Sequence, residues 1–92
     1  MAKNKRPRFR AKEVTLLECE PGSFDDNGEA ATVITLATKS HIEPVVINLA
    51  DSRKLVVEML VCLHSNDDEI AAKILADSFS VKDGQYCWPL AE

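Results

Sequence analysis

The hydrophobic pattern of this chain changes period once, near residue 50, and no other feature constrains the fold as strongly. Before the change, residues that favour strands gather in three short segments: 14–20, 31–38 and 45–49. Turn-forming residues such as Pro21-Gly22 and Asp26-Asn27-Gly28 separate the first two segments. Because the connections are short, we expect a meander of three antiparallel strands.

After the change, the apolar positions follow the period of a helix. Asp51 or Ser52 can cap a helix that runs to about His64. Its apolar residues nearly encircle the axis, since three charged positions form a narrow strip for solvent. A helix of this kind must be covered on more than one side. We expect the sheet to cover one side and a further element to cover another.

A second, shorter helix is expected to supply part of that cover. Asn66 stands three residues before Glu69, which is the spacing of a capping box. The negative side chains at 67–69 suit the positive end of a helix dipole. The pattern predicts that this helix ends near Asp77.

The C-terminal segment leaves two alternatives open. Asp83-Gly84 is a hairpin-turn sequence, flanked by apolar residues at 79–81 and 86–88. These residues form either a small terminal hairpin or a packed irregular tail. The expected fold is α+β: a three-stranded antiparallel meander followed by two helices packed on one face, with a short C-terminal strand or tail.

Charge divides the chain into two parts that its net charge of -4 conceals. Residues 1–12 contain six basic side chains and no acid, which gives +6. Residues 13–92 contain five basic and 15 acidic side chains, which gives -10. A chain of 92 residues has room for one domain. We therefore predict a flexible basic arm at 1–12 and a single small α+β domain at 13–92.

The basic arm is the candidate nucleic-acid-binding segment. Its cations can neutralise phosphates, and its aromatic ring can stack on a base or wedge into a groove. The residues concerned are Lys3, Lys5, Arg6, Arg8, Phe9, Arg10 and Lys12. The alternative is a solvated tail that aids solubility, and the charge of -10 on the rest of the chain repels phosphate.

Cysteine spacing and apolar run length bear on the compartment. Cys19, Cys62 and Cys87 are an odd number at wide spacing, which is not a disulfide framework, so we expect a cytoplasmic location. Cys62 lies in an apolar run, where we expect it to be buried. The longest uninterrupted apolar run, Met59–Leu63, is too short to cross a bilayer, so no membrane partner is expected.

Groups that bind metals or carry out catalysis are scattered along the chain. The cysteines and histidines lack the C-x-x-C and H-x-x-x-H spacings of zinc sites, and the acidic segment 25–29 lacks the spacing of a calcium loop. Cys87 and His41 can act together only if folding assembles them. The nucleophile-elbow, phosphate-loop and dinucleotide patterns are missing. We therefore predict no catalytic, metal or cofactor-binding residues and a protein that is not an enzyme.

The first helix supplies the candidate protein interface. Because the second helix is short, we expect the flank around Val57 and Val61 to stay uncovered and to pair across a two-fold axis. Tyr86 and Trp88 are candidate interface anchors, since such residues dominate binding hot spots. The leading hypothesis is a small non-enzymatic interaction module that forms a homo-oligomer or binds a protein partner. The alternatives are an accessory protein that binds nucleic acid through the arm and an acidic inhibitor or nucleic-acid mimic.

Overall fold

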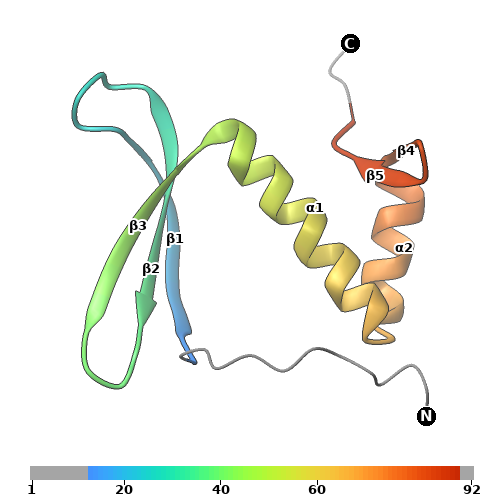
Figure 1. The fold of residues 1–92 in the computed structure, drawn as a ribbon, viewed down its shortest axis with the longest axis horizontal. Coiled ribbons are helices and arrows are strands. Elements are labelled where there is room, and N and C mark those ends of the chain that lie inside the picture. The colour runs from blue at the N-terminus through green and yellow to red at the C-terminus, as the bar shows by residue number, and fades with distance from the viewer. Residues whose placement is uncertain (1–12, 90–92) are drawn as a thin grey trace.

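Three strands, two helices and a terminal hairpin follow one another in the order that the hydrophobic pattern predicts (Figure 1). The structure, a computed structural model, describes residues 13–89. Its elements are β1 (Thr15–Ser23), β2 (Ala30–Ala37), β3 (Ile42–Asn48), α1 (Leu49–Ser65), α2 (Glu69–Ser78), β4 (Ser80–Lys82) and β5 (Gln85–Cys87). The predicted α+β class is confirmed, and the C-terminal segment is a hairpin rather than an irregular tail.

The first three strands form one antiparallel sheet in the order β1-β2-β3. Two of its strands are longer than predicted, because β1 continues through Pro21-Gly22 and β3 begins at Ile42 and includes Pro44. Both prolines are tolerated because β1 and β3 are edge strands, where a missing N–H can face away from the sheet. A bulge between Leu16 and Glu18 shifts the register of β1 against β2.

The connection from β1 to β2 is the acidic turn that the sequence predicts. The Phe24 N–H donates to the Glu29 carbonyl at 3.0 Å, and the Gly28 N–H donates to the Phe24 carbonyl at 2.9 Å. Gly28 has a φ of 70°, which glycine adopts without steric cost. Asn27 Oδ1 accepts from the Glu29 N–H at 2.9 Å, as in an Asx turn. Phe24 is half-buried beside this turn.

Helix α1 follows β3 directly, and the residue that joins them is Asn48. Its side-chain oxygen accepts from the Asp51 N–H at 2.7 Å, so Asn48 is the N-cap of α1. The prediction of a cap at Asp51 or Ser52 is therefore wrong, because these residues already lie in the first turn. Ser52 Oγ instead lies 2.7 Å from the Asn48 carbonyl, within the first turn, and 2.8 Å from Thr32 Oγ1, and the contact with Thr32 ties α1 to β2.

The joint between the two helices also differs from the prediction. Asn66 belongs to the end of α1, where its Nδ2 donates to the Cys62 carbonyl at 2.8 Å. The N-cap of α2 is Asp68, whose carboxylate accepts from the Ala71 N–H at 3.0 Å. The predicted capping box at Asn66 is therefore wrong, because the preceding helix uses that side chain.

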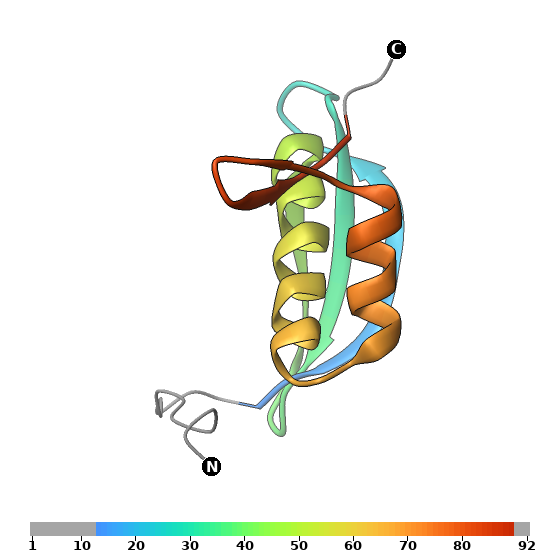
Figure 2. The ribbon, with the colours of Figure 1, turned by 90° about the vertical axis from the view of Figure 1, so that its right-hand side faces the viewer.

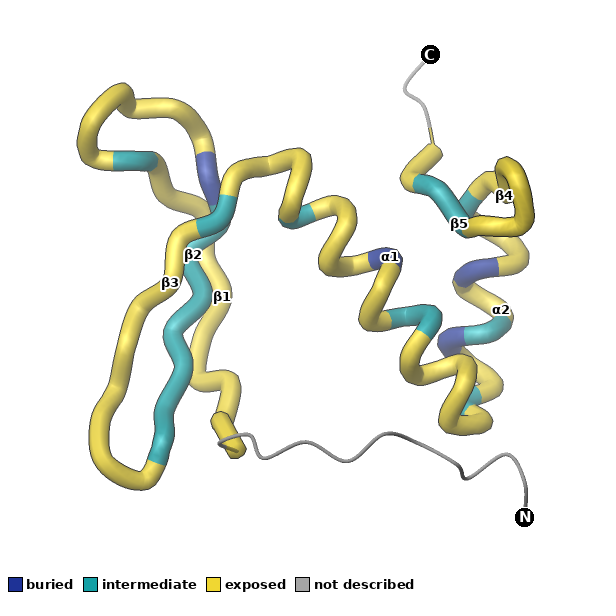
Figure 3. The backbone as a smooth tube through the Cα atoms, in the orientation of Figure 1, coloured by how far each residue is buried: buried dark blue, intermediate teal, exposed yellow. Residues whose placement is uncertain are grey.

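The buried core lies between the helices rather than on the sheet (Figure 3). Among residues 13–89, four side chains are buried, and three of them belong to α1 and α2: Val57, Ala71 and Leu75. The fourth, Ala31, belongs to β2. Most side chains of the sheet are therefore exposed or half-buried rather than part of the core.

The terminal hairpin follows α2 and packs against α1. Asp83 and Gly84 have φ values of 53° and 78°, as in a type I′ turn between β4 and β5. The rings of Phe79 and Trp88 meet edge to face with centroids 5.7 Å apart.

The sheet and the helix pair form the two arms of a V (Figure 1). Both helices lie on one side of the sheet, as predicted, and Figure 2 shows them side by side in one layer with the sheet behind. Helix α1 touches β2 and β3, whereas α2 packs on α1. Because α1 slopes away from the sheet, the two arms separate from the Asn48 end of α1 onward (Figure 1).

Candidate interaction surface

One arm of the V presents an apolar face of the sheet toward the helices. The hydrogen bond between Thr32 and Ser52 shows that Thr32 points toward α1. Because side chains alternate along a strand, Ile34 and Leu36 share its side of β2. Directly paired residues of neighbouring strands share a face, which adds three large aliphatic side chains from β1 and β3. We call this set the sheet wall: Leu16, Ile34, Leu36, Val45 and Ile47.

Charge distinguishes the two faces of the sheet. Glu18 and Glu20 pair with Thr35 and Val33, so they lie on the face opposite the sheet wall. On the sheet-wall side the acid is Glu43, at the far end of β3. Its carboxylate lies 3.0 Å from His41 Nε2. The opposite face also carries Val46 and Ile42, but there they share the face with the two acids of β1. The sheet wall is incompletely covered: Leu16 is 61% exposed and Val45 is 37% exposed.

The other arm presents an apolar stripe of α1. Ser52, which touches β2, marks the side of the helix that faces the sheet. Apolar residues recur on this side at spacings of three and four, as a single helix face requires. All are exposed, and Met59 is 58% exposed. We call this set the helix wall: Leu49, Leu55, Val56, Met59 and Leu63.

The two walls meet where α1 leaves the sheet. Ile47 of the sheet wall and Leu55 of the helix wall line one hollow of about 290 Å³. Beyond this point each wall continues without the other. The candidate interaction surface therefore consists of two apolar faces, one on the sheet and one on α1, which meet at one end and diverge from there.

The predicted interface residues Val57 and Val61 belong to neither wall. Val57 is 7% exposed, so the expectation that this flank of α1 stays uncovered is wrong. Val57 lies about 200° around the helix from Leu55, on the side that faces α2 and the terminal hairpin. Val61 is half-buried on the same side. The uncovered flank is the opposite one, the helix wall.

The terminal hairpin helps to cover the Val57 flank of α1. Tyr86 is half-buried and lines two hollows together with Val57. Trp88 is 42% exposed and packs edge to face on Phe79. An interface role for Tyr86 and Trp88 stays a prediction, and both line a hollow with Val57, on the flank of α1 opposite the helix wall. Figure 1 shows β5, which contains Tyr86, on the other side of α1 from the sheet.

The candidate nucleic-acid-binding residues Lys3, Lys5, Arg6, Arg8, Phe9, Arg10 and Lys12 lie outside the described residues. The hypothesis that they bind nucleic acid stays a prediction. Both walls, in contrast, lie wholly within the described part of the chain.

The turn between β2 and β3 carries a polar cluster that the sequence did not single out. Ser40 Oγ lies 3.3 Å from His41 Nδ1, and His41 Nε2 lies 3.0 Å from Glu43 Oε1. A serine, a histidine and a carboxylate in a row resemble a nucleophile with its base and orienting group. Here the three belong to four consecutive residues, and the His41 and Glu43 side chains are 50% and 64% exposed. An exposed pair of this kind contributes little to stability, and water is free to enter it.

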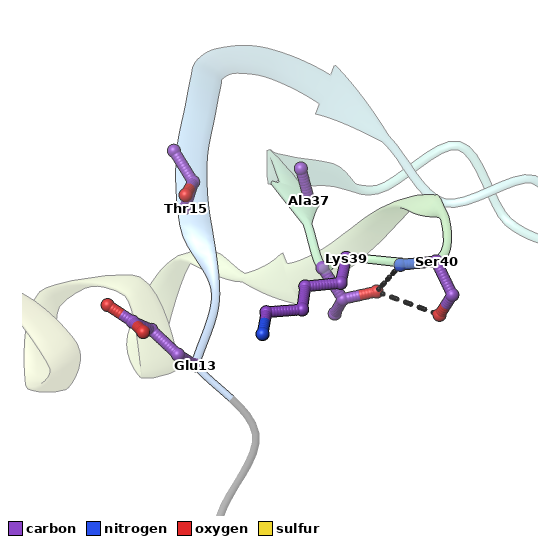
Figure 4. Close-up of a pocket in the computed structure, with 6 residues that line it drawn as sticks. Glu13, Thr15, Ala37, Lys39 and Ser40 are labelled. Atoms are coloured by element: carbon purple, nitrogen blue, oxygen red, sulfur yellow. Dashed lines mark hydrogen bonds between the residues drawn. The ribbon is translucent and has the colours of Figure 1, made fainter.

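The hydrogen bonds around this cluster show that it stabilises the turn. Thr38 Oγ1 accepts from the backbone N–H groups of Ser40 at 3.3 Å and His41 at 3.2 Å. Figure 4 shows the neighbouring hollow, across which Lys39 extends toward the segment of Glu13 and Thr15. The residues that line this hollow are mostly exposed and come from the end of the sheet at the β2–β3 turn, and none of them belongs to either wall.

The remaining chemistry-bearing side chains lie apart from one another. His41 is at the turn between β2 and β3 and Cys87 is in β5, at opposite sides of the molecule (Figure 1), so folding does not bring this pair together. Cys19, Cys62 and Cys87 are free thiols, and Cys62 is exposed rather than buried as predicted, because it lies at the edge of the helix wall. Residues 13–89 contain no group of His, Cys, Asp and Glu side chains able to hold a metal ion.

Comparison with known proteins adds no relative. No protein family, curated protein or solved structure matches this chain. Within the described residues, no helix is both long and apolar enough to cross a membrane.

Proposed function

We propose that this protein is a small non-enzymatic interaction module that acts as a homodimer. The observation that carries the proposal is the pair of apolar walls. Both walls belong to well-formed elements of the protomer, yet no other part of residues 13–89 fully covers them. Hydrophobic residues make up 46% of the chain, yet four side chains of residues 13–89 are buried. A contiguous apolar surface of this kind on a small domain marks an interaction site.

Energetics favour association through many side chains at once. Fully burying one aliphatic side chain contributes about 1.5–3 kcal/mol, and the wall residues are already partly covered. Association itself costs about 4–15 kcal/mol in lost freedom of motion. Several side chains must therefore be buried together, and the ten residues of the two walls form such a set.

Light scattering after size-exclusion chromatography tests the proposal. At tens of micromolar protein, the dimer has twice the mass of the 10.2 kDa chain. Dilution should shift the mass toward one chain, because dimerisation follows mass action. A single-chain mass throughout this concentration range would contradict the proposal.

A further inference from the structure

The way in which β3 joins α1 prevents each protomer from closing its own V. Strand β3 ends at Asn48 and α1 begins at Leu49, so no linker residue lets the helix turn back over the sheet. The cap at Asn48 and the hydrogen bonds of Ser52 to Asn48 and Thr32 hold the first turn of α1 in one direction. The 17 residues of α1 then extend roughly 25 Å along that direction.

The helix wall and the sheet wall are surfaces of the two types that pack on each other in small domains. A helix stripe and the apolar face of a sheet are the two surfaces that pack together in a two-layer α+β domain. This chain carries one of each but holds them apart. A two-fold axis would bring each helix wall onto the sheet wall of the other copy, so both contacts would form at once.

The size of the walls suits a second copy. From their exposed fractions, the wall side chains present on the order of 600 Å² per protomer, close to the roughly 800 Å² per partner of a standard stable interface. Neither wall includes a charged side chain, and the charged neighbours of the walls are exposed residues at their margins: Glu43 beside Leu36, and Asp51, Lys54 and Glu58 beside Leu55.

Association through the outer edges of β1 and β3 is disfavoured. Pro21 interrupts the outer edge of β1, a bulge near Leu16 distorts it further, and Pro44 interrupts the outer edge of β3. Prolines and bulges are the devices that keep edge strands from pairing with other chains. Association is therefore expected through the sheet wall and the helix wall.

From these observations we infer that two copies form a dimer in which the helix wall of each protomer packs on the sheet wall of the other. We call this reciprocal contact the exchange. The inference rests on the proposed homodimer and specifies its interface. Ser52 stays on its own sheet, so the exchanged contact begins at Leu55 and extends through Met59 to Leu63.

Two charged variants and their mixture test the exchange. Met59→Lys alters the helix wall and Val45→Glu alters the sheet wall. Each variant alone spoils both contacts of the dimer, so we expect its dimer dissociation constant to rise by about ten-fold or more, since each buries a charge. In a mixture, a mixed dimer keeps one wild-type contact, and in its other contact the introduced lysine of one copy faces the introduced glutamate of the other.

The mixture should therefore contain more dimer than either variant alone, which light scattering detects. Ile70→Lys is the matched control, because Ile70 is 73% exposed on α2, outside both walls, and its variant should dimerise normally. Circular dichroism checks that each variant keeps its helices and strands, and recovery on mixing itself requires folded chains.

The possible results separate the inference from the proposed function. Wild-type protein that is monomeric contradicts both. A wild-type dimer that resists both wall substitutions, or that dissociates with Ile70→Lys, overturns the exchange but leaves the homodimer. Symmetric pairing of two α1 helices would make Met59→Lys harmful and Val45→Glu harmless, and this result also overturns the exchange.

Discussion

Gly22 shows how one position fixes the contact between two strands. A Cβ atom at this position would lie 2.6 Å from Val33 Cγ2, so the Val33 side chain occupies the space that glycine leaves. Val33 is β-branched and has little rotamer freedom with which to move aside. Because glycine leaves room for Val33, β1 stays paired with β2 through Pro21-Gly22, where the sequence pattern predicts a break.

We predict that Gly22→Ala lowers the free energy of unfolding by about 1–3 kcal/mol, as overpacking does. Urea denaturation at a fixed protein concentration measures the change. In a Val33→Ala background the same substitution should cost much less, because the clashing methyl group is gone. Equal losses in the two backgrounds would show that Val33 is not the cause.

Capping residues show what sequence cannot decide at this scale. Asn48, Asp51 and Ser52 all favour the N-cap position, and they lie within five residues of one another. The path of β3, which ends at Asn48, makes that residue the cap. A pattern of side chains carries no information about where the preceding strand will end.

At the scale of elements, Leu75 holds the two helices together. Its side chain is fully buried on α2, and the other large buried side chain of the helix pair is Val57 of α1. The period of the apolar residues predicts both helices. It does not show which flank of α1 would be covered, because the cover depends on how the hairpin at 80–87 folds back.

We predict that Leu75→Ala lowers the free energy of unfolding by about 2–5 kcal/mol, since it leaves a cavity between α1 and α2. Chemical denaturation monitored by helix circular dichroism measures this loss. The neighbouring Ile74 is 40% exposed, so Ile74→Ala is the matched control and should cost clearly less. A similar loss for the two variants would contradict the central place of Leu75 in the core.

At the scale of the whole molecule, the angle between the sheet and the helices is the feature that sequence could not predict. Strand and helix periods locate apolar faces, but the separation of the two arms depends on the direct joint at Asn48. The sequence pattern leads us to expect an uncovered flank of α1 around Val57, whereas the structure covers that flank and exposes the opposite one. The sheet wall, built from Leu16, Ile34, Leu36, Val45 and Ile47, is a surface that the sequence pattern did not single out.

Deleting residues 1–12 separates the two functions that the sequence suggests. Both walls lie within residues 16–63, so the shortened chain should dimerise as the full chain does. It should also lose any salt-sensitive binding of nucleic acid, because six cations are removed. Gel-shift and light-scattering measurements on both chains check this, and a nucleic-acid shift that survives the deletion would refute a role for the arm.

Contact between the walls of different copies can be observed directly by nuclear magnetic resonance. In a dimer of one isotope-labelled and one unlabelled chain, filtered nuclear Overhauser spectra report contacts between copies alone. The exchange predicts signals between the Met59 methyl group of one copy and the methyl groups of Ile34, Leu36 or Val45 of the other. Signals that join the α1 helices of the two copies to each other, with none between helix wall and sheet wall, would contradict it.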